Sequence, residues 1–133
     1  MKTTNRIVCT VCSRRKNEDP ALMPAYLRYQ GPHIQIAKAI ADKEGFDFVI
    51  LSGKYGLISG DKKIPYYDYL LIEDAVANLV GIVSKQLYEL GVTELELYAE
   101  PREGNWIPYY EVIERATDVT GTKLTLSLTP SRH

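Results

Sequence analysis

A hydrophobic segment that runs directly into a polar turn does most to limit the folds open to this chain. Residues 46–51 read FDFVIL, and they are followed at once by SGKYGL and soon afterwards by KKIPYYDYLL at residues 62–71. A short, continuous apolar run bounded by turn residues is typical of a buried strand. The segment RIVCTVC at residues 6–12 leads in the same way into Ser13 and a basic cluster. Both segments predict strands of a sheet with polar groups at their carboxyl ends.

Helical periodicity separates the apolar strand segments. The expected elements are strands at residues 7–12, 46–51, 95–98 and 124–128, and helices from Pro32 to Gly45, from Glu73 to Gly91 and from an Asn105 cap to Gly121. This β-α-β-α-β-α-β order predicts an α/β fold, a small Rossmann-like three-layer sandwich with a mainly parallel four-stranded sheet. Thr125 and Ser127 alternate with leucines, which indicates that the last strand lies at an edge.

The size and composition of the chain exclude several classes of protein. With 133 residues, of which 45% are hydrophobic and 25% charged, the chain fits one α/β domain over residues 1–133 and is neither disordered nor fibrous. No stretch has the apolar length of a membrane span. The apolar run near the amino terminus is too short and too interrupted for a signal peptide. We therefore expect a cytoplasmic protein with no membrane partner.

Positive charge is concentrated at the start of the chain, although the net charge is −1. Residues 1–16 contain no acid and hold Lys2, Arg6, Arg14, Arg15 and Lys16. A local basic region on a nearly neutral chain favours a small anionic or nucleotide-like ligand over a long nucleic-acid track. A nucleic-acid partner stays open, because a compact basic patch can hold one phosphate of a polymer.

The chain has ten tyrosines but only two phenylalanines and one tryptophan. Several tyrosines fall near predicted loops. A tyrosine ring offers a flat face for stacking a base and a hydroxyl for orienting it. We expect most tyrosines to pack at the boundary of the core, and Tyr55 or Tyr67 to stack on a ligand.

The cysteines have CxxC spacing but do not predict a metal or redox site. Cys9 and Cys12 lie within a predicted strand, where residues three apart point to opposite faces, so we expect no disulfide. The chain offers only two histidines and no second CxxC, so we expect no metal and no cofactor. Cys12, close to Arg14 and Lys16, is either a reactive thiol with a lowered pKa or, as we favour, a small buried residue.

Three segments are expected at the carboxyl edge of the sheet, where ligands of open α/β sheets bind: residues 13–16, 52–57 and 99–102. SGKYG lacks the spacing of a Walker loop, but a turn with free N–H groups and one lysine can hold an anion. Lys54 taken alone is more typical of a solvated loop lysine, and its neighbours are what favour a ligand-binding role. Asp68 is either a general base or nucleophile, or the cap of a turn, and composition alone favours the cap. His33 is either an acid/base residue or a surface residue near a helix start.

The ordered motifs resemble those of an uncharacterised family of small microbial and phage proteins. Cys12-Ser13 with Lys16 resembles its CSxxK motif, residues 51–57 resemble LS(A/G)KYGL, and Tyr67-Asp68 with Leu71 resembles PYDxxL. The second and third segments are more remotely similar to the YaaA peroxide-stress family. The first is similar to the core domain of archaeosine synthase, which modifies a deazaguanine base in tRNA.

The resemblance covers about the first seventy residues and implies an association with nucleic acid or its modified bases. The chain departs from the motifs at two places. Gly53 stands where alanine is commoner, and an extra tyrosine separates Pro65 from Tyr67-Asp68. The second departure affects the expected placement of Asp68.

Motifs and resemblance together favour an enzyme acting on a nucleotide, nucleoside or modified base, by cleaving or exchanging a glycosidic bond or by transferring a group. Asp68 is expected to be the acid/base or nucleophile, and Lys16 and Lys54 to hold phosphate or stabilise negative charge. The expected ligand-binding residues are Cys12, Ser13, Arg15, Ser52, Gly53, Tyr55, Gly56 and Tyr67.

The alternative is a non-enzymatic, stress-related module that binds nucleic acid or a nucleotide. Its contact surface would consist of Arg14, Arg15, Lys16, Lys62 and Lys63. A purely structural or partner-binding domain is a third interpretation, which the polar motifs at the strand ends disfavour.

Overall fold

The computed structural model describes residues 5–129, whose main feature is a five-stranded sheet covered by helices. Its strands are β1 (Arg6–Val11), β3 (Asp47–Ser52), β4 (Gly56–Ser59), β6 (Glu94–Ala99) and β7 (Lys123–Leu128), and its long helices are α2 (Pro32–Glu44), α3 (Glu73–Leu90) and α4 (Ile107–Thr120). The strand order is β4-β3-β1-β6-β7. All neighbours pair in parallel except β3 and β4. The predicted α/β sandwich with a mainly parallel sheet is confirmed, but the sheet has five strands rather than four.

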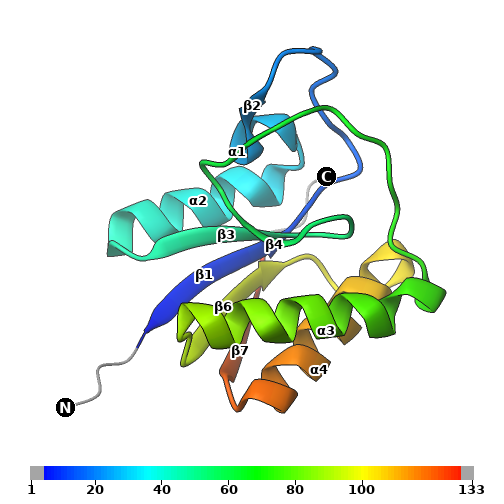
Figure 1. Cartoon of the computed structure of the whole chain (residues 1–133). Coiled ribbons are helices and arrows are strands. Elements are labelled where there is room, and N and C mark those ends of the chain that lie inside the picture. The colour runs from blue at the N-terminus through cyan, green and yellow to red at the C-terminus, as the bar shows by residue number, and fades with distance from the viewer. Residues whose placement is uncertain (1–4, 130–133) are drawn as a thin grey trace.

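Helices cover both faces of the sheet, with α2 on one face and α3 and α4 on the other (Figure 1). The central strand β1 shows why. Val8 packs with Ala37 and Ala41 of α2, whereas Ile7 and Cys9 lie in the core beneath α3 and α4. Successive side chains of a strand point to opposite faces, so the continuous apolar run of β1 requires cover on both sides.

The strand that the sequence analysis missed is β4, which forms an antiparallel hairpin with β3. Leu51 lies opposite Leu57, and Ser52 lies opposite Gly56. Gly56 has a φ of 77°, a conformation that favours glycine. Residues 53–55 are therefore the turn of a hairpin, not a connection from a strand to a helix. A strand as short as β4 has no periodicity that separates it from a loop.

A small unit is formed by two segments that are far apart in the chain: one precedes α2, and the other lies between β4 and α3. It contains β2 (Met23–Pro24), α1 (Ala25–Arg28) and β5 (Lys63–Ile64), with β2 and β5 forming an antiparallel pair. Arg28 is fully buried. Its guanidinium donates to the backbone carbonyls of Asn17, Asp19, Ala21 and Ile64 at 2.6–3.1 Å. One side chain thus satisfies carbonyls of an irregular loop that would otherwise lack donors.

The three long helices end before Gly45, Gly91 and Gly121, as predicted. The start of α4 differs from the prediction. A short 3-10 turn, η1 (Gly104–Trp106), leads into it, and no side chain caps either element, so the predicted Asn105 cap is wrong. Pro108 lies in the first turn of α4, where its missing N–H needs no partner. Within residues 5–129 no helix has the length and apolarity to cross a bilayer.

Replacing Arg28 with Met is expected to lower the free energy of unfolding by about 3 kcal/mol, because buried carbonyls lose a charged donor. The midpoint of thermal unfolding should fall by roughly 10 °C. Denaturant and thermal unfolding measure both quantities. Arg102→Met is the matched control, since Arg102 is exposed and pairs with exposed Glu114, and it should change stability by about 0.5 kcal/mol or less. Equal losses in the two variants would contradict the role of Arg28.

Candidate functional site

The carboxyl end of β1 lies beside a cavity of about 340 Å³. Four predicted site residues line it, namely Cys12, Ser13, Lys16 and Asp68. The other lining residues are Val11, Arg14, Tyr69, Leu70, Asn105, Trp106 and Tyr109. The sequence analysis missed Trp106 as a site residue and assigned Asn105 to a helix cap. Their only sequence signal is that they follow residues 99–102, which were expected at this edge.

A second group of predicted residues surrounds the ring of Tyr67. The Nζ atoms of Lys16 and Lys54 lie 4.8 Å and 5.3 Å from the centre of this ring. Tyr55 packs edge-on against it, with ring centres 5.4 Å apart. A cation near the face of an aromatic ring is attracted by the ring quadrupole. Tyr67 thus holds near one point two ammonium groups that come from separate loops.

The Tyr67 hydroxyl is fixed by a buried hydrogen-bond chain. It bonds to the hydroxyl of Ser52 at 2.9 Å and to the hydroxyl of Tyr29. Ser52 Oγ also accepts the backbone N–H groups of Lys54 and Tyr55, each at 3.1 Å. Because a hydroxyl oxygen has two acceptor lone pairs, Ser52 donates its proton to Tyr67. Ser52 is fully buried, and through these bonds it fixes the positions of the Tyr67 hydroxyl and of the hairpin turn. Burial raises the pKa of Tyr67 to about 12, so the phenol is neutral at physiological pH.

Ser13 shapes the loop after β1, and its hydroxyl is already engaged. It donates to the carbonyl of Arg15 at 2.6 Å and accepts the N–H of Gly31 at 3.1 Å. A Cβ at Gly31 would lie 2.9 Å from Ser13 Cβ, so glycine permits this close approach. The side chain of Arg15 is exposed and does not line the cavity. Ser13 therefore forms part of the wall, and Arg15 lies outside it.

Lys16 and Asp68 bring opposite charges to the same cavity. Lys16 is partly buried, and Asp68 is exposed. Burial lowers the pKa of the Lys16 ammonium, and the Asp68 carboxylate acts in the opposite direction. No hydrogen bond within residues 5–129 engages the Asp68 carboxylate, which leaves its oxygens open to a ligand or water.

The hairpin glycines Gly53 and Gly56 have steric roles. A Cβ at Gly53 would lie 3.1 Å from the Tyr109 hydroxyl and 3.2 Å from Leu71 Cβ. A Cβ at Gly56 would lie 2.6 Å from the side chain of Gln86. Both glycines therefore allow the hairpin to pack tightly against its neighbours, which places Lys54 and Tyr55 at the tip.

Both cysteines are free thiols, and Cys9 is fully buried. Burial raises the pKa of each thiol. For Cys12 this outweighs the nearby positive charge, so the lowered pKa considered from the sequence is wrong. Among the residues described, no three His, Cys, Asp or Glu side chains are grouped to hold a metal ion.

His33 is buried at the start of α2, so the surface alternative is wrong. Its Nε2 bonds to the Val11 carbonyl at 2.7 Å, and its ring packs against Trp106 with centres 4.9 Å apart. Nδ1 has no hydrogen-bond partner and lies 3.7 Å from a carboxylate oxygen of Glu100. Burial lowers the pKa of His33, while the Val11 bond and Glu100 oppose that shift. The neutral ring therefore supports Trp106 and the end of β1 from behind the cavity wall.

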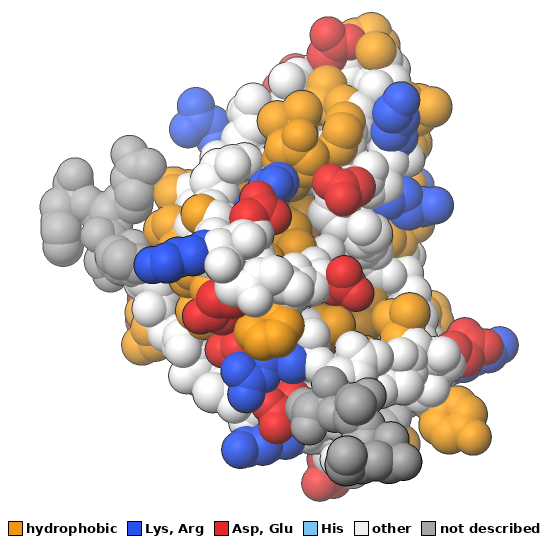
Figure 2. Space-filling view, turned by 90° about the vertical axis from the view of Figure 1, so that its left-hand side faces the viewer, with side chains coloured by type: hydrophobic (Ala, Val, Ile, Leu, Met, Phe, Trp, Pro, Cys, Tyr) orange, Lys and Arg blue, Asp and Glu red, His pale blue; other side chains and the backbone are white. Residues whose placement is uncertain are grey.

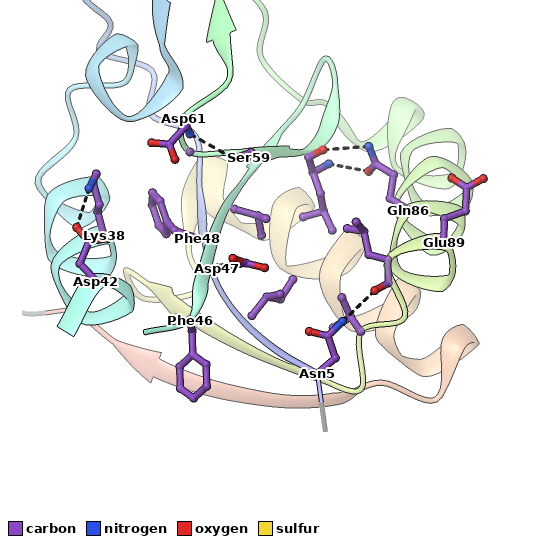
Figure 3. Close-up of a pocket in the computed structure, with 16 residues that line it drawn as sticks. Asn5, Lys38, Asp42, Phe46, Asp47, Phe48, Ser59, Asp61, Gln86 and Glu89 are labelled. Carbon is purple, nitrogen blue, oxygen red and sulfur yellow. Dashed lines mark hydrogen bonds and ion pairs between the residues drawn. The ribbon is translucent and has the colours of Figure 1, made fainter. Parts of the chain in front are cut away.

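A larger cavity, of about 750 Å³, lies at the opposite end of the sheet, around the start of β3 (Figure 3). Phe46, Asp47 and Phe48 line it, and the ion pair of Lys38 and Asp42 borders it. Figure 2 looks onto this end, where hydrophobic side chains lie among separate acidic and basic ones. None of the predicted site residues lines this cavity. We therefore place the candidate site at the strand carboxyl ends.

The buried histidine predicts a pH dependence of stability. The pKa of His33 is lower in the folded chain than in the unfolded chain. Its contribution to the free energy of unfolding is therefore complete above the unfolded pKa of about 6.5, and it is lost as the pH falls below that value. When the pH falls from 7.5 to 5.5, the free energy of unfolding of the native chain should decrease by roughly 1 kcal/mol more than that of a His33→Gln variant. The glutamine of this variant keeps a donor for the Val11 carbonyl but does not titrate. Urea unfolding at both pH values measures the difference, and parallel losses would contradict the prediction.

Comparisons of the chain with models of known protein families, with curated proteins and with solved structures find no match. The motif resemblance over residues 12–71 therefore stays a prediction. The candidate site rests on its own geometry, namely a cavity at the strand ends and two ammonium groups held beside Tyr67.

Proposed function

We propose that the protein is an enzyme that binds a nucleotide, nucleoside or modified base at the strand carboxyl ends. The observation that carries the proposal is the pair of ammonium groups, Lys16 and Lys54, near the Tyr67 ring. Lys16 lines the cavity of about 340 Å³, Lys54 lines a separate one of about 170 Å³, and Tyr69 lines both. Cavities of a few hundred Å³ are typical of small-molecule sites. Lys16 is partly buried, whereas Lys54 is exposed at the hairpin tip. An ammonium group in a partly desolvated position, such as that of Lys16, stabilises phosphate or developing negative charge more strongly than it does in water.

The proposed aromatic contacts differ from those expected from the sequence. Tyr67 is buried, and Tyr29 and Tyr55 pack against its ring, so little of that ring is left for a base. Tyr69 is 41% exposed and lines the cavity, as does the partly buried Trp106. We assign base stacking to these two rings, since stacking needs an accessible aromatic face.

Asp68 is the proposed acid/base or nucleophile. Its carboxylate is exposed at the cavity and close to the charge of Lys16. In the hydrolysis of a glycosidic bond, it would take a proton from the attacking water, while the electron pair of the broken bond leaves with the base. In a transfer reaction it would instead attack the sugar carbon. In both cases Lys16 or Lys54 would offset the negative charge on the leaving group or a phosphate.

A thermal-shift screen with nucleotides, nucleosides, free bases including deazaguanines, and short oligonucleotides tests the binding step. At a hundredfold excess over its dissociation constant, a ligand should stabilise the native chain by about 2.7 kcal/mol. Lys16→Met and Lys54→Met should lose most of this shift. Lys85→Met, which removes an exposed lysine of α3, is the matched control and should keep it. If all three variants respond like the native chain, the two lysines do not bind the ligand.

The same screen separates the pocket from the nucleic-acid-binding alternative. Lys62 and Lys63 are exposed and do not line the cavity of Lys16. A small ligand held in the pocket should give a salt-resistant shift that Lys62→Met leaves unchanged. Shifts only with oligonucleotides, fading with salt and weakened by Lys62→Met, would favour the binding module.

Asp68→Asn should reduce turnover of the ligand found in this screen by about a hundredfold or more, because the amide cannot accept the proton. The thermal shift by that ligand should be largely kept, since the shapes of the two side chains match. Asp61→Asn, at an exposed aspartate after β4, is the control and should leave turnover unchanged. Native-like turnover in Asp68→Asn would exclude a catalytic role for this carboxylate.

A further inference from the structure

β7 forms an open edge of the large sheet, because it is hydrogen-bonded only to β6. The N–H groups of Lys123 and Thr129 bond inward, toward the β6 side. Backbone groups alternate in direction along a strand, so the N–H and C=O groups of Leu124, Leu126 and Leu128 point away from the sheet. No other residue of the described chain hydrogen-bonds to these outward groups.

The opposite edge of the sheet, formed by β4, is protected. β4 has only four residues. The side-chain amide of Gln86 accepts the Leu57 N–H at 2.7 Å and donates to the Leu57 carbonyl at 3.0 Å, as Figure 3 shows. This amide takes the place of a neighbouring strand. Proteins usually blunt sheet edges with short strands, proline, charge or a covering segment. β7 has no proline, and Lys123, its first residue, is its only charge.

The open edge also carries exposed apolar side chains. Leu126 pairs with Leu97 of β6 and Leu128 with Ala99, which places both leucines on the face that α3 and α4 cover. Leu126 is nevertheless 48% exposed and Leu128 59% exposed. An unpaired backbone edge and uncovered leucines therefore coincide on one strand.

We propose that two copies of this chain associate through β7, antiparallel and about a two-fold axis at Leu126, so that their sheets become continuous. With Leu126 opposite its own copy, Leu124 lies opposite the partner's Leu128. Every outward N–H and C=O group of the three leucines then has a partner. All these leucine side chains lie on the same face, where cross-strand pairs bury the surface that a single copy exposes.

The sequence of β7 favours a second copy as the occupant. In this register Thr125 lies opposite the partner's Ser127, so small hydroxyl side chains meet on the other face. Lys123 lies opposite the partner's Thr129, and therefore no like charges face each other across the two strands. A two-fold axis uses the same patch twice, and this patch is complementary to itself in both hydrogen bonding and side-chain type.

Sedimentation velocity of the full chain, from roughly micromolar to roughly millimolar concentration, tests the association. The native chain should convert from monomer to dimer over this range. Leu126→Lys puts like charges directly opposite each other at the two-fold axis and should weaken dimerisation at least about tenfold. Leu27→Lys is the control, because Leu27 lies on α1 and is 46% exposed, and this variant should dimerise like the native chain.

Amide hydrogen exchange of the native chain locates the interface without any variant. The amides of Leu126 and Leu128 should exchange slowly in concentrated protein and rapidly in dilute protein. The inward-bonded amide of Thr129 should not respond in this way. A chain that stays monomeric over the whole range overturns the proposal, and so does a dimer in which the Leu126 amide still exchanges rapidly.

Discussion

The hydroxyl of Tyr67 joins parts of the chain that are far apart in sequence. Through Ser52 it is anchored to the end of β3, and through Tyr29 to the residue that follows α1. Its ring supports both Lys16 and Lys54. A single hydrogen bond of this kind contributes only about 1 kcal/mol to stability. Its importance lies in position, because the loop after β1, the hairpin turn and the loop before α3 share this one support.

The same arrangement supports the proposal that the site binds an anionic ligand. Lys16 is partly buried and its pKa is lowered, so the fold holds a charged group where the charge is disfavoured. The Tyr67 ring and the Asp68 carboxylate offset only part of that cost. A ligand that brings negative charge to Lys16 and Lys54 would offset the rest, and perturbed groups of this kind are concentrated at functional sites.

Much of the framework could be predicted from the sequence, because β1, β3, α2 and α3 have long apolar patterns with clear ends. The strand β4 could not, since four residues carry no usable period. The bond between Tyr29 and Tyr67 spans 38 residues and depends on tertiary packing. The roles of the serines also needed the structure. The sequence placed Ser13 and Ser52 at the strand ends, but it could not show that other protein groups already engage their hydroxyls.

The β3–β4 hairpin contributes to the candidate site and also forms one edge of the sheet. Because residues 53–55 turn the chain back, β4 becomes an edge strand, and Gln86 satisfies its outer groups at Leu57. Within residues 5–129, β7 is therefore the edge of this sheet that is left open for pairing. β1 and β6 separate β7 from β3, so a second copy paired along β7 would leave the hairpin turn with Lys54 accessible. The proposed ligand site and the proposed dimer interface use residues on different strands, so a change at one surface need not disturb the other.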